Sequence, residues 1–196
     1  MKKYFVFVIV IAICLACSND ETPTIEYPKC DYFPLQVGNK WYYKSSTTEI
    51  TGKETINDQE WFIMTKSYVH ENQEPTIYRI YYRKTEDGKV YQKSDENNDS
   101  FLVFDLKIGF KQSWKYTDGD NQWKVSTGDD FETIKLEDSS ITNCRSYYYD
   151  IPEAVDDEHV KILAPGLGLI SSSSLAWGFS DTLQRAVING LEVTIK

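Results

Sequence analysis

The sequence IYRIYYR at residues 77–83, followed by the turn pair Asp87-Gly88 and by Val90-Tyr91, decides the fold class. Its residues are aromatic, aliphatic or basic, and alternate positions form two sets, as the two faces of a β-strand do. An Asp-Gly pair between two such runs favours a tight hairpin turn. We therefore expect an antiparallel hairpin in this part of the chain.

Similar strand and turn signals recur on both sides of this hairpin. Runs of aromatic residues, or of alternating apolar residues, lie next to turn pairs such as Gly-Asn, Asn-Asp, Asp-Gly and Asn-Gly. These runs occupy residues 41–43, 61–64, 114–116, 123–125, 183–188 and 191–195. No window of about eleven residues after the N-terminal leader shows a convincing helical period. We therefore predict an all-β fold, a single antiparallel β domain built as a curved meander, a sandwich or an open half-barrel.

Two segments of the chain resemble each other weakly. LQVG at residues 35–38 precedes Trp41 and Tyr43, and LKIG at residues 106–109 precedes Trp114 and Tyr116. Both segments place apolar residues and a turn glycine before an aromatic strand. A two-fold internal repeat would explain this similarity, and chance is the alternative.

The amino-acid composition limits the kinds of partner that the protein can bind. The chain has 196 residues, 41% of them hydrophobic, which fits one ordinary globular domain. Its 21 lysines and arginines stand against 30 acidic residues, so the formal charge is -9. Such a surface repels phosphate backbones, and we expect no nucleic-acid partner.

The N-terminus has the organisation of an export signal. Lys2 and Lys3 precede an uncharged apolar run that ends at Ala16, and a helix of that length, about 20 Å, is too short for a hydrocarbon core of about 30 Å. The run ends in Cys-Leu-Ala-Cys, which resembles a bacterial lipobox. We predict that residues 1–16 are a lipoprotein signal peptide and that Cys17 carries the lipid that anchors the protein to a membrane. The alternative is a secreted protein cut after Ala16.

The segment after Cys17 predicts where the protein resides. Residues 17–30 are polar and contain two prolines, which is typical of a flexible tether, and residues 31–196 form the predicted β-rich domain. The polar and acidic residues 18–21 resemble the export tract of Bacteroidota surface lipoproteins. We expect an outer-membrane lipoprotein of the cell envelope, with either membrane face still open.

Two further cysteines remain after Cys17. In the oxidising envelope, Cys30 and Cys144 are candidates for one disulfide that closes a loop of about 100 residues. The alternative is a pair of buried free thiols.

Four segments in order along the chain look similar to Bacteroidota-type envelope lipoproteins. They are FPLQVGNKW at residues 33–41, DGKVY at 87–91, LVFDLKIG at 102–109 and APGLGLI at 164–170. The resemblance implies an anchored, β-rich envelope protein without an assigned reaction. It supplies no catalytic residues.

The motifs of common enzyme classes are missing from the sequence. There is no Gly-x-Ser-x-Gly elbow and no Ser-x-x-Lys. Asp95, Asn97 and Asp99 have the spacing of a calcium loop, but Ser100 and Leu106 stand where that loop needs Gly and Glu. We therefore predict no catalytic residue, no metal and no cofactor, and a non-enzymatic role is favoured.

The tryptophans are the candidate ligand-binding residues. Trp114 and Trp123 flank the Asp118-Gly119 turn, where exposed rings could stack on sugars. In β proteins most such rings instead fill the core and pair across strands.

The sequence is compatible with three functions. The first is a lipid-anchored, non-enzymatic binding or accessory module for a partner protein or a glycan. The second is a carrier of lipids or other hydrophobic ligands, with a curved sheet around an apolar interior. The third is a hydrolase with dispersed carboxylates.

Overall fold

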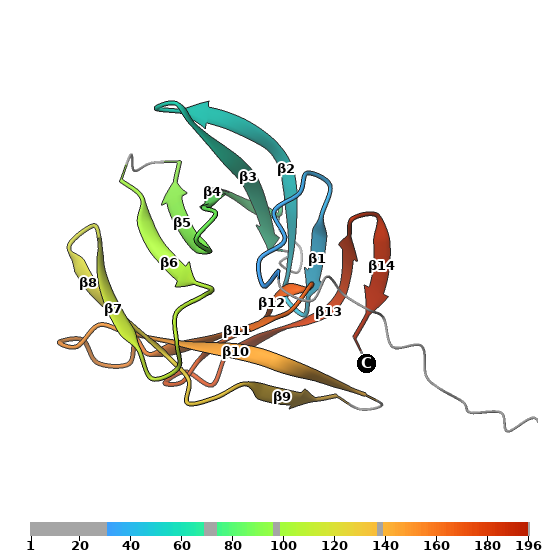
Figure 1. Ribbon diagram of the computed structural model, residues 1–196. Helices are drawn as coiled ribbons and strands as arrows, with labels where there is room; N and C mark the ends of the chain where they lie inside the picture. Colours follow the sequence, from blue (N-terminus) through green and yellow to red (C-terminus); the bar gives the residue numbers. More distant parts are fainter. Residues whose placement is uncertain (1–30, 69–73, 96–98, 137–138, 196) are drawn as a thin grey trace, which may run out of the picture.

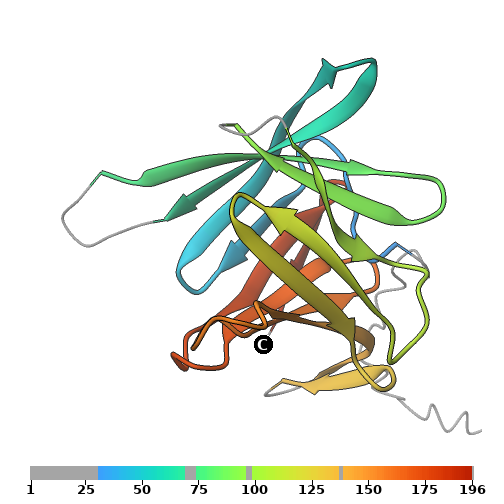
Figure 2. The same cartoon turned by 90° about the vertical axis from the view of Figure 1, so that its left-hand side faces the viewer.

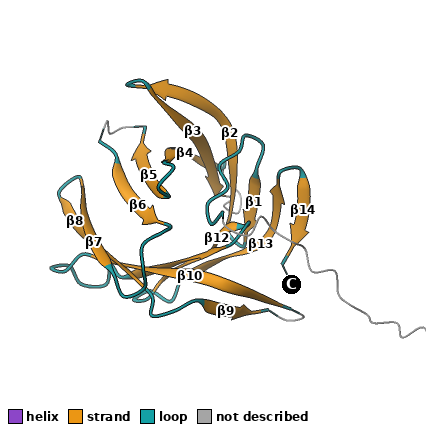
Figure 3. Cartoon of the chain, viewed as in Figure 1, coloured by secondary structure: helices purple, strands orange, loops and turns teal. Residues whose placement is uncertain are grey.

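Every regular element of the described chain is a β-strand. The computed structural model describes residues 31–68, 74–95, 99–136 and 139–195, and in these ranges it contains fourteen strands and no helix (Figures 1 and 3). A helix long and apolar enough to cross a membrane is accordingly not found among these residues. The predicted all-β, antiparallel fold is confirmed.

The strands lie at the following positions along the chain. The first seven are β1 (Lys40–Tyr43), β2 (Ser46–Ile56), β3 (Gln59–Tyr68), β4 (Thr76–Lys84), β5 (Lys89–Ser94), β6 (Phe101–Asp105) and β7 (Ser113–Asp118). The others are β8 (Asn121–Thr127), β9 (Glu132–Lys135), β10 (Ser140–Asp150), β11 (His159–Ala164), β12 (Gly168–Ser174), β13 (Ser180–Ile188) and β14 (Leu191–Thr194).

The strands form one continuous sheet whose two arms meet in the middle. Its order is β6-β5-β4-β3-β2-β1-β13-β12-β11-β10-β8-β7, while β14 pairs with β13 and β9 pairs with β10. All these pairs are antiparallel, and the arms join where Trp41 of β1 stands opposite Ala186 of β13. The sheet curls until its two ends approach each other (Figure 1). Of the three predicted architectures, the observed one is a curved meander that is nearly closed into a barrel.

Side chains close the seam between the end strands β6 and β7. The indole nitrogen of Trp114 donates to the carbonyl of Leu102 at 2.9 Å, and the rings of Phe101 and Tyr116 stack with centroids 4.7 Å apart. Figure 2 views the molecule from this side. Below the seam, the guanidinium of Arg145 donates to the carbonyls of Leu106 and Ile108 and so holds the β6–β7 connection.

Both faces of IYRIYYR are covered only in its second half, residues 80–83, whereas Ile77, Tyr78 and Arg79 are exposed. Ile80 and Tyr82 of β4 face the barrel interior. On the opposite face Arg83 lies over two rings, 5.4 Å from the centroid of Trp61 and 4.9 Å from that of Tyr91. The predicted hairpin is present as β4 and β5, with Gly88 at a φ of 86° in the turn.

The four segments that carry the family resemblance pack against one another in two pairs. In the first pair, the indole of Trp41 donates to the carbonyl of Leu167 at 2.6 Å, and an added Cβ on Gly168 would lie 3.3 Å from the Pro34 ring. In the second pair, the amide of Leu106 donates to the carbonyl of Gly88 at 2.9 Å. These motifs therefore have structural roles at the ends of the barrel. Trp41 lies in β1, in the middle of the sheet, whereas Trp114 lies in β7, at one end of it, and the predicted internal duplication stays a prediction.

Candidate functional site

A cavity of about 250 Å³ lies inside the curled sheet. The inward positions of β1 to β6 form one side of it and those of β11 to β13 form the other. Most of its wall is apolar or aromatic, and the main contributors are Leu35, Trp41, Met64, Ile80, Phe104 and Leu169. The alternation of β-strands explains this wall, because every second side chain of each strand points into the barrel.

The segment before β1 closes one end of the cavity. The ammonium of Lys84 lies 2.6 and 2.7 Å from the carboxylate oxygens of Asp31 and donates to the carbonyl of Phe33 at 2.9 Å. The Phe33 ring packs against Tyr82 and Phe104, with centroids 5.1 and 5.5 Å away. Residues 31–35 therefore form a plug at this end, and Phe33 is part of the cavity wall.

The cavity continues into a more open hollow near the β3–β4 end of the barrel. The two spaces share Lys66, Tyr68, Ile80 and Gln92 in their walls. At the hollow, the rings of Tyr68 and Tyr78 meet edge to face with centroids 5.9 Å apart. The hollow therefore lies next to the cavity and is the candidate entrance for a ligand.

Two lysines line the cavity from different strands. Lys66 belongs to β3, and Lys161 belongs to β11. The ammonium of Lys161 lies 4.4 Å from the ring centroid of Tyr149 and 5.9 Å from that of Phe104. Within the described residues, neither lysine has a carboxylate oxygen within 4.0 Å, the limit for a salt bridge.

The surroundings of Lys161 lower the pKa of its ammonium group. The side chain is half-buried and lines the cavity. Burial, together with the positive charge of Lys66, lowers the pKa of Lys161 to about 8. Near neutral pH the ammonium is therefore still mostly protonated and still short of a counter-charge.

Four other polar side chains of the wall already have hydrogen-bond partners within the protein. Asp181 accepts hydrogen bonds from the amide of Ser45 at 3.0 Å and from the hydroxyl of Ser46 at 2.7 Å. Tyr43 donates to the carbonyl of Leu169 at 2.7 Å, and Tyr82 donates to the amide oxygen of Gln92 at 2.8 Å. Burial raises the pKa of both phenols, so they remain neutral. The lysines are thus the charged groups of the wall with which an anionic ligand could pair.

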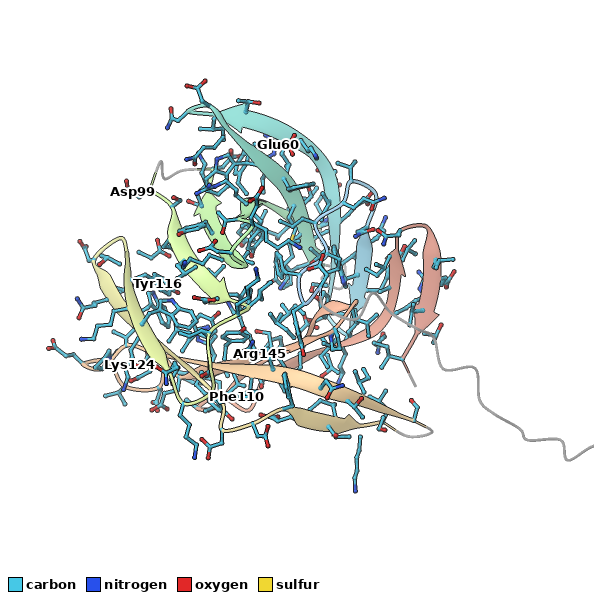
Figure 4. The ribbon with its side chains drawn as sticks, in the orientation of Figure 1. Glu60, Asp99, Phe110, Tyr116, Lys124 and Arg145 are labelled. Atoms are coloured by element: carbon cyan, nitrogen blue, oxygen red, sulfur yellow. The ribbon has the colours of Figure 1, made fainter. Side chains whose placement is uncertain are left out.

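The candidate tryptophans belong to an aromatic column at the seam end of the interior. Trp114 and Trp123 are both half-buried and pack against the core. Tyr116, labelled in Figure 4, lies between Phe101 and Trp123, with ring centroids 4.7 and 6.3 Å away. His159 continues the column by stacking on Tyr149 at 4.7 Å. The two predicted platform residues thus contribute to packing here, and their role toward a ligand stays a prediction.

The remaining predicted site residues are two cysteines of the N-terminal segment and Cys144. Cys17 and Cys30 lie outside the described residues. Cys144 is fully buried, and its sulfur lies 3.4 Å from the carbonyl oxygen of Ile141. Lipidation at Cys17 and the Cys30–Cys144 disulfide both stay predictions.

Sequence reasoning missed the two cavity lysines, and among the tryptophans it favoured Trp114 and Trp123 over the exposed Trp177. Lys161 stands in the apolar run VKILA, and a lysine in such a run is a weak signal of a charge that faces inward. Trp177 is 77% exposed at the β12–β13 turn. The described parts of the chain contain no group of three or more His, Cys, Asp or Glu side chains that could hold a metal ion.

Comparisons with known proteins identify no family for this chain. No protein-family model and no curated protein matches the chain. Among solved structures, a candidate lipoprotein from Parabacteroides distasonis ATCC 8503 matches at 12% sequence identity with a TM-score of 0.39, over 84% of this chain and 98% of that one. This superposition is too loose to establish a common fold or a common function.

Proposed function

We propose that this chain is a lipid-anchored binding protein of the bacterial cell envelope that holds a small, largely apolar ligand inside its barrel. The observation that carries the proposal is the cavity of about 250 Å³ with its apolar and aromatic wall. A protein interior is normally close-packed, with few voids larger than a water molecule. The cavity therefore supports the carrier hypothesis, which requires an apolar space within a curved sheet.

The volume of the cavity limits the size of the ligand. An engineered cavity of about 150 Å³ holds benzene, and most ligand pockets measure about 300 to 1,000 Å³. Scaled from the six carbon atoms of benzene in about 150 Å³, a cavity of 250 Å³ corresponds to about ten heavy atoms, as in a fatty acid of eight carbon atoms. A longer ligand would extend through the open hollow past Tyr68.

The N-terminal sequence supports a place at the membrane. Lipid on Cys17 would anchor the chain, and fourteen tether residues reach at most about 50 Å when fully extended. The domain would then remain near a membrane surface, where apolar ligands concentrate. Replacing Cys17→Ser is expected to move the protein from the membrane fraction to the soluble fraction, and retention in the membrane would contradict the anchor.

The binding proposal is tested by filling the cavity. Ser172 of β12 lines it, whereas Ser173, the next residue, points to the other face of the same strand. We expect Ser172→Phe to weaken binding of 1-octanol, measured by titration calorimetry, by about tenfold or more, because the ring occupies the ligand's space.

Ser173→Phe is the matched control, and its affinity for 1-octanol should equal that of the wild type. The proposal fails if the wild-type protein does not bind 1-octanol, or if both variants bind it as well as the wild type does.

A second candidate function rests on an exposed apolar cluster, the loop patch. It comprises Val155, Leu175, Trp177 and Phe179, which are 86%, 58%, 77% and 53% exposed. Two hydrogen bonds join its loops: the indole of Trp177 donates to the carbonyl of Asp156 at 3.0 Å, and the amide of Leu175 donates to that of Glu158 at 2.9 Å. Exposed patches of this kind mark interaction sites.

The loop patch supports the first hypothesis, a module for a partner protein or a glycan. If a glycan binds there, Trp177→Ala should abolish binding on a glycan array and Trp123→Ala should not. An unchanged profile for Trp177→Ala would exclude this site for glycans.

A further inference from the structure

We infer that the ligand of the cavity is a singly charged amphiphile, an apolar chain of about eight carbon atoms with a carboxylate head that Lys161 and Lys66 hold. The inference rests on the proposed function, because it assigns a chemical class to the ligand of the same cavity. Three observations carry it: the two lysines, the charge balance of the wall, and the separation of polar from apolar side chains.

The lysines supply the first observation. A buried ammonium without a counter-charge is costly, since the protein interior solvates charge poorly. Lys161 contacts the faces of Tyr149 and Phe104, which compensate only part of that cost. Lys66 brings a second ammonium close enough to disfavour the charge on Lys161. An anion between the two would relieve the repulsion and supply the missing ion pair.

The charge balance of the wall favours a single negative charge on the ligand. Against the two ammonium groups, the described wall holds one carboxylate, that of Asp181, and Ser45 and Ser46 already bind it. The net charge of the site is therefore one positive unit. A carboxylate matches this charge, whereas a phosphate monoester carries close to two negative charges near pH 7.

The polar side chains gather around the lysines. The pairing of β11, β12 and β13 places Ser172 opposite Lys161 and also opposite Asp181, and the pairing of β2 with β3 places Thr48 opposite Lys66. The hydroxyls of Ser172 and Thr48 can donate to a carboxylate. Most of the remaining wall, which includes Met64 and Leu169, is apolar or aromatic and suits the chain of the ligand.

The test compares three ligands that share one chain: octanoate, 1-octanol and octyl phosphate. Their affinities for the full mature chain are measured by titration calorimetry at pH 7. We expect octanoate to bind about tenfold or more tightly than 1-octanol, since a hydrogen bond to a charged group contributes at least that ratio. Lys161→Met should remove this preference, so that the variant binds octanoate no more tightly than 1-octanol.

Two further variants complete the design. Lys66→Met should reduce the preference for octanoate by a smaller factor, and it serves as the test variant if Lys161→Met does not fold. Lys124→Met is the control, because Lys124 is an exposed residue of β8 (labelled in Figure 4) and should not affect any of the three affinities.

Each contrary outcome identifies what has failed. Equal affinities of the wild type for octanoate and 1-octanol would overturn the inference and leave the proposed function standing. No binding of either ligand would overturn the proposed function and the inference together. Octyl phosphate binding more tightly than octanoate would overturn the assignment of a carboxylate, and a preference that survives in both lysine variants would overturn the assignment of the lysines.

Discussion

Lys161 is a residue whose position costs the protein stability. Its ammonium is surrounded by aromatic rings and a second lysine, and the described residues provide no carboxylate within salt-bridge distance. Methionine has nearly the same length and carries no charge. We predict that Lys161→Met raises the free energy of unfolding by about 1 to 3 kcal/mol at pH 7, measured by urea denaturation. Lys124→Met, on the exposed face of β8, should change it by less than about 0.5 kcal/mol.

The pH dependence provides an independent check on the same residue. The pKa of Lys161 is about 8 in the folded chain and that of an ordinary lysine is 10.5, so between these values the unfolded state binds more protons. Stability of the wild type should therefore rise with pH from about 8, and the advantage of Lys161→Met should shrink. The comparison stops near pH 9.5, because the buried tyrosines titrate near pH 10 once unfolded. The titratable groups near Lys161 are Lys66, Asp181, Tyr147, Tyr149 and His159. An advantage of the variant that stays constant with pH would assign the stability change to packing.

His159 provides the corresponding prediction in acid. Burial beside Tyr149 and Trp123, with the charge of Lys161 nearby, lowers the pKa of His159 to about 4. The unfolded chain takes up a proton near pH 6.5 and the folded chain does not, so stability falls as the pH drops from about 6.5 to 4. We predict that His159→Phe removes up to about 3 kcal/mol of this loss. Urea midpoints of both proteins at pH 6.5 and 4.5 measure it, and parallel decreases would contradict the assignment.

At the level of elements, the seam between β6 and β7 is the weakest closure of the barrel. Side chains join these strands, mainly through the Trp114–Leu102 hydrogen bond and the Phe101–Tyr116 stack. We predict that Trp114→Phe, which keeps a ring but removes the donor, lowers the free energy of unfolding by about 1 to 2 kcal/mol. Hydrogen exchange should accelerate in β6 and β7 and stay unchanged in β3 and β4. Uniform acceleration across the sheet would show that the seam does not open separately.

The strands were predictable from the sequence where local chemistry is strong. IYRIYYR with its Asp-Gly turn predicts the β4–β5 hairpin, and the aromatic runs around Asp118-Gly119 predict β7 and β8. The long strand β2 gave no such signal, because its sequence STTEITGKETI is mostly polar and its outer half is exposed. Threonine and isoleucine support its extended backbone, but no apolar alternation marks it.

The candidate site was not predictable from local sequence, because it depends on register and curvature. Lys161 faces the cavity only because it pairs with Tyr147 on one side and Ser172 on the other, and a shift by one residue would turn it outward. The approach of β3 toward β11 follows from the curl of the whole sheet. By contrast, the Gly88 turn needs only its own backbone, with a φ of 86°, and the sequence predicted it directly.

For the whole molecule, the sign of the surface charge opposes that of the cavity. The chain carries a formal charge of -9, while the described cavity wall carries two ammonium groups and one carboxylate. An anionic ligand is therefore repelled at long range and attracted only after it has entered. Salt screens exposed charges over about 8 Å at physiological ionic strength, whereas it screens buried pairs much less.

This arrangement predicts an unusual salt dependence. Raising the salt concentration from about 10 to 300 mM should increase the association rate of octanoate several-fold, because the repulsion is screened, and should change its dissociation rate little. The rates can be measured by stopped-flow tryptophan fluorescence, since Trp41 lies in the cavity wall. The uncharged 1-octanol is the control, and its association rate should not depend on salt. A rate for octanoate that falls with salt would mean that the cationic site, and not the acidic surface, controls the approach of the ligand.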